Sequence, residues 1–62
     1  ALVLDKRLAM AHRALGDARW RGRAISALAF EAGFGDLSYF NRSFRRRYGM
    51  TPSEVRAQSL RP

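Results

Sequence analysis

The chain has 62 residues, which is enough for one small domain with a modest hydrophobic core. With 47% apolar residues it is too hydrophobic to be a disordered segment, and without cysteine it can form neither a disulfide nor a thiolate metal site. Twelve Lys and Arg residues against five Asp and Glu give a net charge of +7, which favours a polyanionic partner, either nucleic acid or a membrane surface, over a neutral one.

Nothing in the sequence indicates a membrane span or a targeting segment. No apolar run approaches the roughly 20 residues that a transmembrane helix needs, and the first residues do not form a signal peptide. The absence of cysteine fits a reducing compartment, so we expect a cytoplasmic protein. Because the sequence starts with Ala1 rather than Met, we also expect it to be a fragment of a longer chain.

An apolar stripe at helical spacing predicts a first helix from Val3 to Leu15. Its members recur at i, i+4, i+7 and i+11, and they are Leu4, Leu8, Ala11 and Leu15. Gly16 is expected to close this helix in the left-handed conformation. Residues 17–23 are expected to form a connector, in which Trp20 packs back on the first helix or, alternatively, contacts a partner.

Two further helices are predicted in the middle of the chain. A short apolar stripe from Ile25 to Ala32 predicts a helix that Gly33 ends. Asp36 is a suitable N-cap for the next helix, from Leu37 to Tyr48, which Gly49 stops. The apolar face of this helix consists of Leu37, Phe40, Phe44 and Tyr48. The opposite face carries Ser38, Arg42, Arg45 and Arg46, with Asn41 at its edge.

The last element is predicted from a capping box. In the run Thr51-Pro52-Ser53-Glu54, Thr and Glu can satisfy each other's backbone N–H groups, and Pro suits the first helical position. A short helix is therefore expected over residues 52–59, with Val55 as its main apolar anchor. The expected fold class is all-α, a small homeodomain-like domain of about four helices.

The second and third helices together have the outline of a helix-turn-helix. Ala29 and Gly33 are small enough to let the two helices cross closely. Arg42 can donate to guanine O6 and N7 in the major groove, and Ser38 and Asn41 can bind either bases or the DNA backbone. Arg45 and Arg46 are better placed for phosphates, although a solvated helix end is the alternative for this basic run.

The run from Ile25 to Arg56 closely resembles the AraC/XylS family of bacterial transcription regulators. The family pattern is an A-x-x-x-G-F turn followed by S-Y-F-x-R-x-F-R/K-R-x-x-G-x-T/S-P-x-E-Y-R, and this chain matches nearly every position. It departs at Val55, where the family has an aromatic residue, and we expect this to loosen the last helix slightly. The first helix resembles the family's connecting helix, with matches at Arg7, Leu8, Ala11 and Leu15.

The resemblance implies that residues 1–62 are part of a larger DNA-binding domain. Family members carry two helix-turn-helix units that enter successive major grooves, about 34 Å apart along the DNA. In this chain the resemblance assigns residues 3–15 to the connecting helix, 24–48 to the second unit and 52–59 to the C-terminal helix. The first unit and the effector and dimerisation domain are then absent from it.

The resemblance also assigns DNA contacts to individual residues. The base-edge contacts that it implies are Ser38 and Arg42, with Leu37 as a further candidate whose wheel position also suits the core. The phosphate contacts that it implies are Arg23, Ser26, Asn41, Arg45 and Arg46. The expected partner is double-stranded DNA, read sequence-specifically in the major groove by a transcription regulator.

Other function classes fit the sequence less well. A basic helical module that binds an acidic protein, for example RNA polymerase, is the alternative, and it is compatible with DNA binding. A membrane-surface helix is disfavoured because the aromatic face is needed for the core. His12 is the only histidine and lies beside no second metal ligand, so we expect no enzyme activity, no metal and no cofactor.

Overall fold

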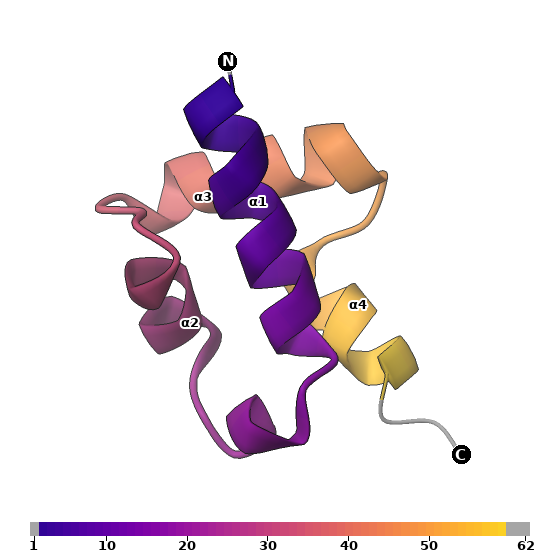
Figure 1. The fold of residues 1–62 in the computed structure, drawn as a ribbon. Helices are drawn as coiled ribbons and strands as arrows, with labels where there is room; N and C mark the ends of the chain where they lie inside the picture. The colour runs from indigo at the N-terminus through magenta and orange to yellow at the C-terminus, as the bar shows by residue number, and fades with distance from the viewer. Residues whose placement is uncertain (1, 60–62) are drawn as a thin grey trace.

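The computed structural model describes residues 2–59 as four α-helices and one short 3₁₀ helix (Figure 1). The elements are α1 (Leu2–Leu15), η1 (Ala18–Trp20), α2 (Ile25–Glu31), α3 (Leu37–Tyr48) and α4 (Pro52–Ser59). No strand occurs within this range, so the predicted all-α class with a helix-turn-helix is confirmed. None of the helices in residues 2–59 combines the length and the apolar character needed to cross a membrane.

Helix α1 is the scaffold on which the other elements are arranged. It packs against α2, η1 and α4, while α3 packs against α2 and α4 and lies across the upper part of the molecule in Figure 1. The predicted stripe of α1 faces the core, with Leu8 2% exposed and Ala11 fully buried. The side chain of Trp20 is half-buried against this core, which confirms that it packs inward.

The ends of α3 and α4 are fixed by the caps that the sequence predicts. The Asp36 side chain accepts a hydrogen bond from the Tyr39 N–H at 3.0 Å, and Gly49 is left-handed with φ 75°. At the start of α4 the Thr51 N–H donates to Glu54 Oε1 at 2.8 Å, and the Glu54 N–H donates to Thr51 Oγ1 at 3.2 Å. These bonds satisfy backbone groups that a helix end otherwise leaves without partners.

The predicted left-handed cap at Gly16 is wrong. The Gly16 and Asp17 N–H groups donate to the carbonyls of Arg13 and Ala14 at 3.1 and 3.0 Å, so the last turn of α1 tightens into 3₁₀ geometry. Among the described residues only Gly33 and Gly49 have a positive φ. A tightened turn needs no left-handed residue, so α1 ends without one.

The connector contains one regular turn, because Asp17 caps η1 by accepting from the Arg19 N–H at 2.9 Å. One expectation for α4 needs correction. The main anchor of α4 is Pro52, which is fully buried, whereas Val55 is only half-buried. The proline ring at the first helical position is therefore the buried residue of α4, and Val55 packs beside it against the core.

Candidate nucleic-acid interface

One face of α3 is locked into the core by aromatic packing. Phe40 and Phe44 are both fully buried, and their rings follow Phe34 and precede Tyr48 in a continuous row. Successive ring centroids are 4.9, 5.7 and 4.7 Å apart at tilted angles, which is favourable for aromatic pairs. This packing confirms the predicted core role of the phenylalanines and fixes how α3 presents its other face.

The polar face of α3 is exposed. Its members are Ser38, Asn41, Arg42, Arg45 and Arg46. Within residues 2–59 none of these side chains takes part in an intramolecular hydrogen bond or salt bridge. Their donors are therefore available to a ligand, and the three guanidinium groups make this face strongly cationic.

Leu37 does not belong to the core face on which the helical wheel places it. Its side chain is 40% exposed and lies outside the buried cluster. As the first residue of α3 it extends beyond the edge of the core, so the apolar face begins at Phe40. This position leaves Leu37 accessible at the start of the exposed helix face.

The two candidate phosphate ligands that precede α3 are placed differently from each other. Arg23 is exposed in the connector, and its Cζ atom lies 4.2 Å from the centre of the Trp20 ring, a cation–π contact. Ser26 is half-buried in the first turn of α2. The structure therefore places the charge of Arg23 on the surface beside α2 and covers part of Ser26.

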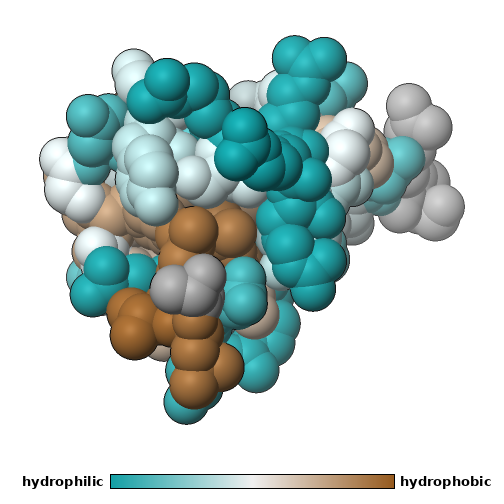
Figure 2. Space-filling view, turned by 90° about the horizontal axis from the view of Figure 1, so that it is seen from above, coloured by the Kyte–Doolittle hydropathy of each residue, from teal (hydrophilic) through white to brown (hydrophobic). Residues whose placement is uncertain are grey.

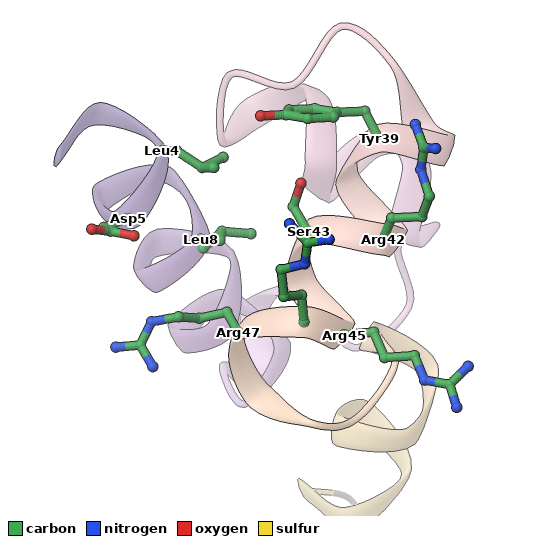
Figure 3. A pocket seen from close by; sticks show the side chains of 9 residues that line it. Leu4, Asp5, Leu8, Tyr39, Arg42, Ser43, Arg45 and Arg47 are labelled. Carbon is green, nitrogen blue, oxygen red and sulfur yellow. The ribbon is translucent and has the colours of Figure 1, made fainter. Parts of the chain in front are cut away.

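Arg45 lies close enough to the Glu54 carboxylate for its charge to act on it. The pKa of Glu54 is lowered by its hydrogen bonds with the Thr51 backbone and side chain, and then by the charge of Arg45. In the view of Figure 3, Arg42 and Arg45 extend away from α1, whereas Arg47 extends to the opposite side of α3. The positive charge of Arg45 therefore acts on the carboxylate at the start of α4.

An open groove of about 950 Å³ separates α3 from the first half of α1 (Figure 3). Leu4 and Leu8 point from α1 toward α3 in this groove, and Tyr39 and Ser43 line its other wall. The sequence did not single out Tyr39 or Ser43, because neither belongs to the core face or to the basic face of α3.

One apolar patch is visible on the surface seen from above. Figure 2 shows this patch around the start of α1, where Leu2 is 70% exposed and Val3 58% exposed. Hydrophilic residues border the patch in this view.

Gly33 follows the C-cap of α2 and ends this helix, as predicted. Its φ of 101° is a conformation that residues with a Cβ rarely adopt. A Cβ added at Gly33 would lie 2.9 Å from Arg7 Nε and 3.2 Å from Arg7 Cδ. The space that Gly33 leaves therefore admits a side chain of α1. Ala29, which is 2% exposed, is packed in the core as predicted.

Two contacts were missed from the sequence. Arg56 donates from Nη1 to the Arg23 carbonyl at 2.7 Å and from Nη2 to the Trp20 carbonyl at 3.2 Å. The His12 ring lies 4.4 Å from the Tyr48 ring, so it packs between α1 and α3. Neither contact has a local sequence signal, because the partners are 33 or more residues apart. Residues 2–59 hold no group of three potential metal ligands.

The sequence of this chain is similar to a known family and to several known proteins. Residues 1–58 match the sequence model of a family described as "Helix-turn-helix domain". The chain is similar to "Transcriptional activator RhrA" of Rhizobium meliloti, with 50% identity over 54 residues that cover 87% of this chain and 17% of that protein.

Two other relatives have comparable similarity. "Virulence regulon transcriptional activator VirF" of Yersinia enterocolitica is 41% identical over 60 residues, 97% of this chain and 21% of that protein. "HTH-type transcriptional regulator ExsA" of Pseudomonas aeruginosa is 41% identical over 56 residues, 90% of this chain and 19% of that protein. The chain thus spans about a fifth of the length of these relatives. No solved structure matches it.

Proposed function

Because the chain belongs to the AraC/XylS type of helix-turn-helix family, we propose that it binds double-stranded DNA sequence-specifically, with α3 in the major groove. The observation that carries this proposal is the division of α3 into two faces. Phe40 and Phe44 are fully buried, while the face from Ser38 to Arg46 is exposed. A helix about 10–12 Å wide fits a major groove about 12 Å wide.

The exposed residues divide into two roles by their chemistry. Arg42 reads base edges through its planar fork, Ser38 donates or accepts one hydrogen bond, and Leu37 makes an apolar contact at the start of the helix. The remaining candidates bind the DNA backbone and set the register of α3, and they are Arg23, Ser26, Asn41, Arg45 and Arg46.

The chain is proposed to be one part of a longer regulator. Residues 1–62 would form part of a DNA-binding domain, with a connecting helix over 3–15, a helix-turn-helix over 24–48 and a C-terminal helix over 52–59. The names of the relatives, two activators and one regulator of transcription, support a role in transcription regulation for the whole protein.

Duplex binding at varied salt concentration tests the proposal. The affinity should fall linearly on a log–log plot, with a slope of about −0.9 for each phosphate contacted. Arg45→Ala should weaken binding to every duplex alike and reduce the magnitude of the slope by about 0.9. Absence of any duplex binding at low salt would show that the proposed function is wrong.

The base-reading role has a separate test. Arg42→Ala should cost about 1–3 kcal/mol on the preferred site and little on unrelated duplexes. Arg13→Ala is the matched control, because Arg13 is an exposed arginine of α1 outside the proposed interface. An equal loss on all duplexes after Arg42→Ala would assign Arg42 to the backbone instead of the bases.

A further inference from the structure

Arg56 joins the last helix to the connector in front of α2. Its guanidinium is half-buried and donates to two carbonyls, those of Arg23 at 2.7 Å and Trp20 at 3.2 Å. The Trp20 carbonyl also accepts from the Arg23 N–H at 3.1 Å. The backbone from Trp20 to Arg23 is thus closed into a turn, and Arg56 holds both ends of that turn.

The side chain of Arg23 is held from the same place. Its Cζ atom lies 4.2 Å from the centre of the Trp20 ring, and Trp20 itself packs against the core. Arg56 therefore fixes the backbone from which Arg23 projects as well as the residue on which its guanidinium rests. The alanine at the N-cap of α2, Ala24, makes no side-chain cap, so local sequence does little to fix this entry.

We propose that Arg56 is a positioning residue, which holds Arg23 ready to contact the DNA backbone. This inference rests on the proposed function. The proposal gives Arg56 no direct phosphate contact, because the residue is half-buried and both of its Nη groups donate to carbonyls of the connector. A connector ordered before binding loses less conformational entropy when a phosphate binds, so the contact is stronger than that of a mobile loop.

The chemistry of the fork makes the proposal specific to arginine. A guanidinium presents several N–H donors in one plane, which suits the two carbonyls at the ends of one turn. A lysine keeps the charge but has a single donor atom on a flexible stem. Arg56→Lys therefore removes the two-point contact and leaves the net charge at +7.

The test combines Arg56→Lys with Arg23→Ala in duplex binding. If one phosphate contact is lost, each single variant should bind about fivefold more weakly at 0.15 M salt, with a slope smaller by about 0.9. Because Arg56 acts through Arg23, the double variant should bind within about twofold of Arg23→Ala alone. Arg13→Lys, which makes the same replacement at an exposed position on α1, should bind as the parent chain does.

A second readout does not depend on DNA. The chain has a single tryptophan, so its fluorescence reports on Trp20 alone. Arg56→Lys should change the emission of Trp20 in the free chain, while far-UV circular dichroism shows unchanged helix content.

Several results would overturn the inference and leave the proposed function standing. Arg56→Lys could bind as the parent does, Arg23→Ala could have no effect, or the two losses could multiply in the double variant. A loss of helix content in Arg56→Lys would show that Arg56 holds the fold and not the contact. Failure of the parent chain to bind any duplex would overturn both proposals.

Discussion

Helix α3 and the connector that leads into α2 are held in place by different forces. Helix α3 rests on apolar burial, with Phe40 and Phe44 fully buried and a cap at each end. In the connector, the short helix η1 contains no buried residue. Apart from the packing of the half-buried Trp20 against the core, the connector depends on the hydrogen bonds from Arg56 and on the exposed ion pair between Asp17 and Arg19, at 2.8 Å.

This difference in stabilising forces also distinguishes the two kinds of proposed DNA contact, those of α3 with the bases and that of the connector with the DNA backbone. Burial of a phenylalanine stabilises by several kcal/mol and is insensitive to salt, whereas a typical hydrogen bond contributes about 0.5–1.5 kcal/mol and an exposed ion pair less. The helix proposed to read bases is therefore held by the stronger interactions, and the segment proposed to hold the DNA backbone by weaker ones. A substitution in one of the two regions should leave the other region folded only as long as the hydrophobic core itself stays folded.

The largest expected effect comes from removing the apolar burial that holds α3. Phe44→Ala should lower the free energy of unfolding by about 3–5 kcal/mol, because it leaves a cavity in a fully buried site. A chain of this size has a total stability of about 3–9 kcal/mol, so urea denaturation should show a mostly unfolded or barely stable variant. Phe30→Ala is the control, since Phe30 is 60% exposed, and it should change stability by less than about 0.5 kcal/mol. Equal losses would mean that burial does not hold α3.

The next effect concerns the turn between α2 and α3. Gly33→Ala should cost about 1–2 kcal/mol, because φ 101° is strained for any residue with a Cβ. The new Cβ would also approach Arg7, whose long side chain can move away at little cost. Urea denaturation of Gly33→Ala with and without Arg7→Ala separates the two terms. If Arg7→Ala restored the parent stability, the contact of the new Cβ with Arg7, and not the backbone strain at φ 101°, would be the cause of the lost stability.

The same contrast explains what could be predicted from the sequence. The helices α3 and α4 run over the predicted residues, because their periodicity and their caps lie within three positions along the chain. The double contact of Arg56 could not be predicted, because its partners are 33 and 36 residues away and carry no pattern. Long-range polar contacts depend on how the finished helices meet.

Two local predictions failed for a related reason. The helical wheel treats α3 as unlimited in length, so it assigns Leu37 to the core although the core does not extend to the first residue. The glycine rule assigns Gly16 a left-handed cap, although tightened hydrogen bonds end α1 there. For the proposed interface, the sequence identified the exposed face of α3 but gave no information on what supports Arg23.

A smaller effect compares one cap from each region. Asp36→Ala should lower the free energy of unfolding by about 1 kcal/mol, since it removes the bond from the Tyr39 N–H at the start of a helix that the core depends on. Asp17→Ala should cost less, because it frees only the single turn of η1. Thermal unfolding of the two variants beside Asp36→Ser, which keeps a capping oxygen, measures the difference. The comparison would be contradicted by a larger loss at Asp17.

The smallest expected effect is the acid sensitivity of the exposed caps. The Arg19 side chain and backbone hold the pKa of Asp17 below its usual 3.8, and the hydrogen bonds with Thr51 hold that of Glu54 below its usual 4.5. A carboxyl whose pKa is lowered by folding contributes stability above its unfolded pKa and loses it as the pH falls through the folded value. The urea midpoint should therefore be level from pH 7 to about pH 5 and fall below about pH 4.5.

Glu54→Gln tests this assignment, because glutamine can keep the reciprocal cap with Thr51 and cannot titrate. The variant should match the parent chain near pH 7 and lose less stability on acidification. Its urea midpoint should retain only the part of the fall that belongs to Asp17 and to other carboxyls. An unchanged acid profile would mean that the capping box of α4 is not what acid breaks, and the polar contacts of the connector would then be the more acid-sensitive region.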